Sequence, residues 1–97
     1  MAFILNIETA TTNCSVSLSK EGKTIVLKED NDKSYSHAER LHVYIDEVLK
    51  EANINSNKLD AISVSKGPGS YTGLRIGVSA AKGLCFALNI PLISGAV

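Results

Sequence analysis

Three short stretches at the start of the chain have the hydrophobic pattern of β-strands. An apolar run over residues 3–7 ends at Glu8, and apolar residues alternate strictly with serines over Cys14–Ser19. A third apolar-rich stretch covers Thr24–Leu27, directly after a Glu-Gly turn. Alternation with a period of two is typical of a half-buried strand, and a short turn between two strands favours a hairpin. We therefore expect an antiparallel meander of three strands.

The hydrophobic period then changes to that of an α-helix. Apolar residues recur every three or four positions over His37–Ala52, where Ser36 and Glu39 form a candidate capping box. A strand is predicted over residues 61–66, a second helix over Thr72–Leu88 with Thr72 as N-cap, and a last strand over residues 90–94. The order β-β-β-α-β-α-β predicts an α/β domain, in which one mixed sheet is covered by helices.

The second predicted helix has more apolar surface than a single sheet can cover. One stripe consists of Leu74, Val78, Ala81, Cys85 and Leu88. The adjoining stripe has smaller side chains and consists of Gly73, Gly77, Ala80, Leu84 and Ala87. Glycine inside a helix costs roughly 1 kcal/mol relative to alanine, so Gly73, Gly77 and Gly83 indicate a close backbone approach. The approaching backbone belongs either to the same domain or to another chain. We expect the second stripe, with the smaller side chains, to contact a partner.

The loop before this helix has the sequence Gly67-Pro68-Gly69, and a glycine-rich turn at a helix N-terminus can bind phosphate. Neither the P-loop pattern nor the G-x-G-x-x-G pattern is present, however. Ten basic and ten acidic residues balance, which argues against direct binding of nucleic acid or a membrane. Cys14 and Cys85 are not at metal-ligand spacing, so we expect buried, reduced thiols in a cytoplasmic protein. The chain stops directly after a predicted strand and looks cut short.

Three segments carry a resemblance to a known family. They are ILNIETATTNCSVSL from Ile4, SHAERL from Ser36, and SKGPGSYTGLRIGVSAAKGL from Ser65. With these segments the chain resembles the TsaB family of tRNA threonylcarbamoyladenosine biosynthesis proteins over essentially its whole length. The resemblance implies the ribonuclease-H-like, actin-like ATPase (ASKHA) fold, with a five-stranded sheet in the order 3-2-1-4-5 and strand 2 antiparallel. It also implies that residues 1–97 are the N-terminal half of a two-domain protein whose second domain is absent.

The resemblance further implies an accessory subunit that is not itself an enzyme. Such subunits assemble with TsaD, and with TsaE in a larger complex, to modify adenosine 37 of tRNA. A homodimer is possible, contact with tRNA is indirect, and no membrane, cofactor or metal is involved. The two helices form the partner surface, and the residues expected on it are His37, Leu41, Gly73, Arg75, Ile76, Gly77, Ala80 and Leu84.

Two other functions are open at this stage. The wider fold superfamily binds ATP near the first hairpin, where Glu8, Thr9 and Thr11 are weak candidates for metal and phosphate contacts in a phosphotransferase. Related proteins were also classed as M22 metallopeptidases. His37 and His42 are five residues apart, however, and this spacing does not suit a single zinc ion bound to one helix.

Overall fold

The computed structural model describes residues 2–9, 14–30, 37–65 and 71–95. The strands are β1 (Phe3–Glu8), β2 (Cys14–Lys20), β3 (Lys23–Asp30), β4 (Ala61–Ser65) and β5 (Leu92–Gly95). The helices are α1 (His37–Ala52), the 3-10 turn η1 (Ser56–Lys58) and α2 (Tyr71–Leu88). The element order is the predicted one.

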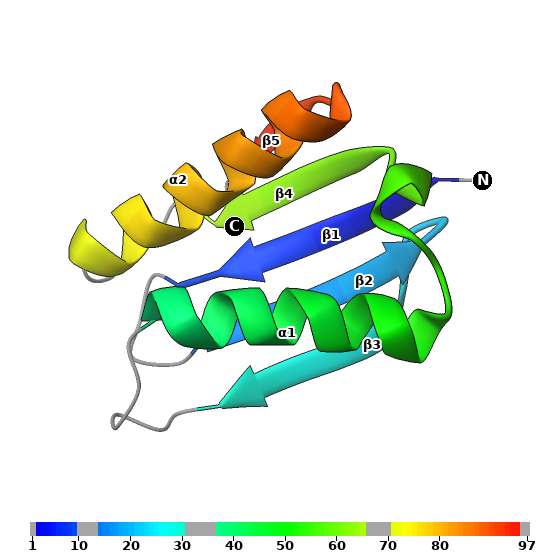
Figure 1. Cartoon of the computed structure of the whole chain (residues 1–97), viewed down its shortest axis with the longest axis horizontal. Coiled ribbons are helices and arrows are strands. Elements are labelled where there is room, and N and C mark those ends of the chain that lie inside the picture. Colours follow the sequence, from blue (N-terminus) through cyan, green and yellow to red (C-terminus); the bar gives the residue numbers. More distant parts are fainter. Residues whose placement is uncertain (1, 10–13, 31–36, 66–70, 96–97) are drawn as a thin grey trace.

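The five strands form one sheet in the order β3-β2-β1-β4-β5. β2 runs antiparallel to both β1 and β3, whereas β4 runs parallel to β1 and β5 parallel to β4. Figure 1 shows the two helices lying over the sheet, roughly along the strands, and both running in the same direction. The predicted fold class, strand order and direction of strand 2 are all confirmed.

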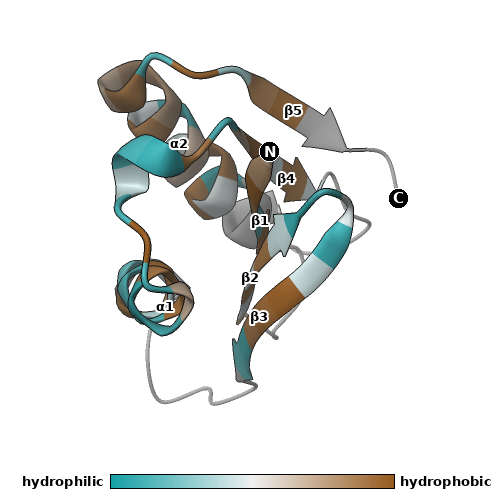
Figure 2. Ribbon diagram, turned by 90° about the vertical axis from the view of Figure 1, so that its right-hand side faces the viewer, coloured by the Kyte–Doolittle hydropathy of each residue, from teal (hydrophilic) through white to brown (hydrophobic). Residues whose placement is uncertain are grey.

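Both described helices lie on the same face of the sheet, as Figure 2 shows. The alternation in β2 sends Cys14, Val16 and Leu18 toward the helices, where all three are fully buried. Leu5 and Ile62 are register partners on that face and are also fully buried. The opposite face is lined by the serines of β2, with Leu27 and Ile93 exposed on the two edge strands. The core therefore lies between the sheet and the helix pair.

Both helices end at an asparagine in the left-handed conformation. Asn53 has φ 57° and Asn89 has φ 56°. After α1, the N–H groups of Asn53 and Ile54 donate to the carbonyls of Lys50 and Leu49. After α2, the N–H groups of Asn89 and Ile90 donate in the same pattern to Phe86 and Cys85. This is the Schellman arrangement, which satisfies carbonyls that the helix end leaves open.

Some element boundaries differ from the sequence predictions. α2 begins at Tyr71, so Thr72 lies inside the first turn and is not the cap residue. β3 continues to Asp30 because its charged end still pairs with Cys14 and Ser15 of β2. β5 begins at Leu92 because the N–H of Ile90 completes the helix end instead. The predicted cap Ser36 lies outside the described residues.

Candidate partner-binding groove

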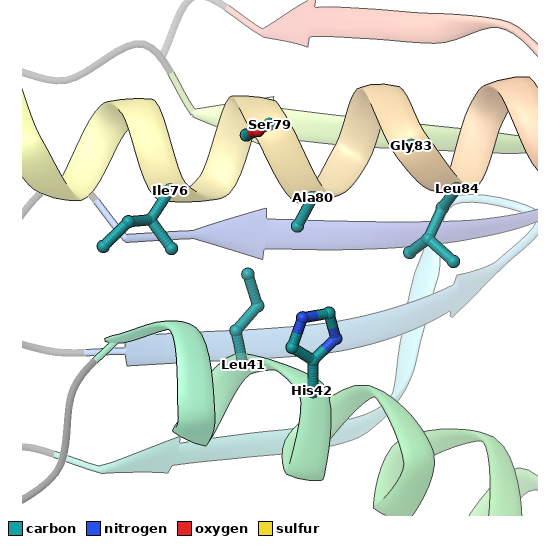
Figure 3. Close-up of a pocket in the computed structure, with 7 residues that line it drawn as sticks. All are labelled: Leu41, His42, Ile76, Ser79, Ala80, Gly83 and Leu84. Carbon is teal, nitrogen blue, oxygen red and sulfur yellow. The ribbon is translucent and has the colours of Figure 1, made fainter.

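A groove of about 490 Å³ lies on the outer side of the helix pair, between α1 and α2. Its lining residues are Leu41, His42, Ile76, Ser79, Ala80, Gly83 and Leu84. Figure 3 shows Leu41 and His42 pointing up from α1 toward α2, and Ile76, Ala80 and Leu84 pointing down toward α1. The groove is mostly apolar, so it is suited to the side chains of a protein partner and not to a charged ligand.

A second cavity of about 560 Å³ continues the groove toward the end of α1. His42 and Leu84 line both cavities, which makes them neighbouring parts of one surface. The added lining comes from Ile45, Asp46, Leu49 and Lys50 of α1, and from Ile54, Asn55, Ser56 and Leu59 after it. The hollow surface therefore extends along most of the helix pair.

The groove brings together four of the residues predicted for the partner surface. Leu41, Ile76, Ala80 and Leu84 line it, with Leu41 fully buried at its base and the other three half-buried. Arg75 is exposed on α2. His37 and Gly73 lie in the two helices, but their surroundings are outside what the structure describes.

Gly77 does not belong to this surface, and its predicted place on the partner side is wrong. Gly77 is buried against the sheet, and a Cβ atom at this position would collide with Thr9 Oγ1. The same atom would lie 3.5 Å from side-chain carbons of Ile7 and Val64. The glycine therefore allows α2 to approach β1 and β4 closely within the same domain.

The predicted partner surface left out three lining residues, His42, Ser79 and Gly83. His42 is exposed, but the prediction gave it no part in the surface. A Cβ atom at Gly83 would meet nothing within 4 Å. Ile76, Ser79, Ala80 and Gly83 occupy positions i, i+3, i+4 and i+7, which form one patch on a helix. That spacing was a usable signal, because three of the four residues have small side chains.

The candidate nucleotide residues lie at the carboxyl end of β1. Glu8 is exposed and pairs in register with Ser15, whereas Thr9 is buried with only 1% of its surface exposed. Thr11 lies outside the described residues. Within residues 2–9, 14–30, 37–65 and 71–95, no three His, Cys, Asp or Glu side chains come together as metal ligands.

Cys14 and Cys85 are both buried, and neither is part of a disulfide, as predicted. Burial raises the pKa of the Cys85 thiol above its ordinary value of 9.0, and the backbone of Ile62 partly offsets the rise. The thiol also donates a hydrogen bond of 3.5 Å to the carbonyl of Pro91. Since nucleophilic cysteines have lowered pKa values, Cys85 is a packing residue of α2.

Comparisons with known proteins agree with this fold. The family model for TsaD, tRNA N6-adenosine threonylcarbamoyltransferase, matches residues 30–94. The tRNA threonylcarbamoyladenosine biosynthesis protein TsaB of Haemophilus influenzae is 36% identical over 90 residues, which is 93% of this chain and 37% of that protein. A tRNA N6-adenosine threonylcarbamoyltransferase of Anoxybacillus flavithermus is 36% identical over 106 residues, which is 94% of this chain and 31% of that protein.

Solved structures give the same picture. YeaZ from Pseudomonas aeruginosa superposes with a TM-score of 0.88 at 36% identity, over 100% of this chain and 44% of that one. RuvC of T. thermophilus, in complex with a Holliday junction substrate, has a TM-score of 0.65 at 12% identity, which is a likeness of fold alone. The chain spans less than half the length of these TsaB, transferase and YeaZ relatives. Among the described residues, no helix is long and apolar enough to cross a membrane.

Proposed function

Because the chain belongs to the family of tRNA threonylcarbamoyladenosine biosynthesis proteins that includes TsaB and TsaD, we propose that it is an accessory subunit of that synthesis. In this role it is not itself an enzyme. It docks with a TsaD-type subunit through the groove between α1 and α2, in an assembly that also includes TsaE. The assembly works in the cytoplasm on adenosine 37 of tRNA, and this chain contacts the tRNA only indirectly.

The observation that carries the proposal is the exposed apolar groove on the outer side of the helix pair. A helix that only covers a sheet presents charged and polar residues to solvent. Beside the exposed polar residues Arg75, Ser79 and Lys82, α2 also presents Ala80, Gly83 and Phe86, which is 91% exposed, next to Ile76 and Leu84. Such a surface gains free energy when another protein covers it.

The alignments favour an accessory subunit of the TsaB type. The match to the Haemophilus protein runs over 90 positions and covers 93% of the chain, so it opens essentially no gap in this chain. The match to the Anoxybacillus transferase needs 106 positions, more than the 97 residues of this chain, and therefore contains gaps. Both matches are 36% identical, but only the TsaB match reaches this identity without opening gaps in this chain, which supports the TsaB-type role.

A substitution in the groove tests the proposal. Gly83→Arg places a long cationic side chain in the groove at a position where the fold has free space. We expect it to weaken binding to the TsaD subunit at least tenfold, on the order of 1.4 kcal/mol, by isothermal titration calorimetry. Thr24→Arg is the matched control, because it adds the same charge at an exposed position of β3 far from the groove.

Because both positions are exposed, we expect each variant to have the urea midpoint of the wild type. An unchanged midpoint shows that the variant is folded. Unchanged TsaD binding by a folded Gly83→Arg variant would rule out the groove as the docking site. Loss of binding in the Thr24→Arg control as well would show a general charge effect in place of a local one.

A further inference from the structure

His42 is an ionisable side chain in an otherwise uncharged part of the groove. The other residues that line the first cavity are Leu41, Ile76, Ser79, Ala80, Gly83 and Leu84. None of these side chains takes up or loses a proton near neutral pH. Figure 3 shows the imidazole ring of His42 projecting from α1 toward α2. Because His42 lines both cavities, the groove has a proton-binding group at the point where they meet.

The charged residues that share a cavity with His42 come from α1 itself. Asp46, one turn after His42, and Lys50, one turn further, line the second cavity with it. Glu39 lies one turn before His42, but its side chain is outside the described residues. Among the described residues, α2 and the segment after α1 contribute no ionisable side chain to either cavity. Asp46 and Lys50 have opposite charges, so together they place no net charge beside the ring.

Covering the groove changes the balance between the charged and neutral forms of an imidazole. An imidazole in water gains its second proton as the pH falls through about 6.5. The ring of His42 is exposed in the free chain, so water can hydrate either form. Burial against apolar side chains removes this hydration and disfavours the charged form. A partner that covers His42 together with Ala80 and Leu84 therefore selects the neutral ring.

We propose that docking on the groove is linked to the loss of a proton from His42, so that the chain binds its TsaD-type partner more weakly when this side chain is charged. The inference rests on the proposed function, because it describes how the same surface is regulated. It goes further in naming the residue through which pH acts and the direction of the effect. By linkage, a complex that holds fewer protons than its free components is weakened as the pH falls.

Calorimetric titration of this chain with the TsaD subunit tests the linkage. Titrations in buffers of different ionisation enthalpy give the number of protons released on binding. At about pH 6.5 we expect the wild type to release about half a proton more than His42→Gln, and at about pH 8 the two should release the same number. Relative to His42→Gln, the wild type should lose about tenfold in affinity between about pH 7.5 and about pH 5.5. Protons released by TsaD itself are common to both titrations and cancel in the comparison.

Two further variants serve as controls. His37→Gln removes the other histidine of the sequence and should release as many protons as the wild type. Asp46→Asn removes the carboxylate that shares a cavity with His42. It should release at least as many protons as the wild type, because a nearby carboxylate favours the charged ring. His42 is exposed, so His42→Gln should keep the urea midpoint of the wild type.

Three results would overturn the inference. They are equal proton release by the wild type and His42→Gln, a wild-type affinity that rises relative to that variant as the pH falls, and a proton release that disappears in either control. Binding of TsaD by the wild type and His42→Gln with the same pH dependence contradicts the linkage and leaves the proposed function intact. A wild type that does not bind TsaD even at about pH 8, where an imidazole is neutral, contradicts both proposals.

Discussion

Two glycines of α2 show how one residue type serves opposite purposes within a single helix. Gly77 has the sheet against its Cα atom, and the space for a side chain is already taken by Thr9. Gly83 faces open space on the other side of the helix. Helix propensity disfavours both to the same extent, so only the surroundings explain Gly77. At Gly83 no contact with the described residues requires a glycine.

The same substitution at these positions should therefore have opposite effects on the free energy of unfolding. We expect Gly83→Ala to stabilise the chain by about 0.5–1 kcal/mol, because alanine loses less backbone entropy in a helix. Gly77→Ala should destabilise it by about 1–3 kcal/mol, because overpacking outweighs the gain in propensity. Urea unfolding of both variants measures the difference. Thr9→Ala combined with Gly77→Ala should recover part of the loss, and equal effects at the two positions would refute the close approach.

At the scale of the elements, the helix ends matter as much as the helix faces. α1 and α2 stop in the same way, with an asparagine in the left-handed region followed by an isoleucine that packs against the core. The paired hydrogen bonds to Leu49 and Cys85 fix the direction in which the chain leaves each helix. These ends lead directly into η1 and β5, so they also fix where β4 and β5 begin.

At the two asparagines, the effect of a substitution on the free energy of unfolding should depend on backbone conformation alone. Asn53→Gly and Asn89→Gly are expected to leave stability unchanged or raise it by up to about 1 kcal/mol, since glycine adopts positive φ freely. Asn53→Ala and Asn89→Ala should lower it by about 1 kcal/mol, because a Cβ atom without a polar side chain is disfavoured there. Thermal and urea unfolding would check that stability decreases in the order Gly, Asn, Ala at each position. Alanine variants as stable as the glycine variants would contradict the left-handed helix ends.

The sequence was sufficient to predict the strands and helices, because each has a clear period. In β2 the alternation of Val16 and Leu18 with serines follows directly from burial on one face. The rotation of α2 was predicted only approximately, because the two apolar stripes adjoin. Ala81 and Cys85 face the core and Ala80 and Leu84 line the groove, as expected, but Gly77 faces the sheet. The contact between Gly77 and Thr9 decides that rotation, and these residues are far apart in sequence. The groove was therefore predicted in outline, with Gly77 wrongly included and Gly83 missed.

Over the whole molecule, the two faces of the sheet differ in what covers them. The helices lie on one face (Figure 2) and bury its central strands, whereas in the described residues the other face is lined by the serines of β2, with aliphatic residues on the edge strands. On that open face Asn6 Nδ2 donates to Ser19 Oγ at 3.4 Å. The free energy of folding thus comes mainly from the side that the helices cover.

Substitutions at Leu18 and Leu27, which lie on adjacent strands, should show how much each face of the sheet contributes to the free energy of unfolding. Leu18 is fully buried under the helices, and Leu18→Ala should cost about 2–5 kcal/mol. Leu27 is 51% exposed on the open face, and Leu27→Ala should cost about 1 kcal/mol or less. Urea unfolding of the two variants gives the comparison. A loss at Leu27 as large as that at Leu18 would mean that the open face is covered in solution.

The contact between Gly77 and Thr9 has a mechanical consequence for anything that docks on the groove. α2 already rests directly on β1 at this point, so pressure from outside cannot push the helix closer to the sheet. The groove between α1 and α2 therefore has its final shape before a partner binds, and binding costs little free energy for rearranging the helices. The affinity of a partner for this groove is then determined by the partner's own side chains.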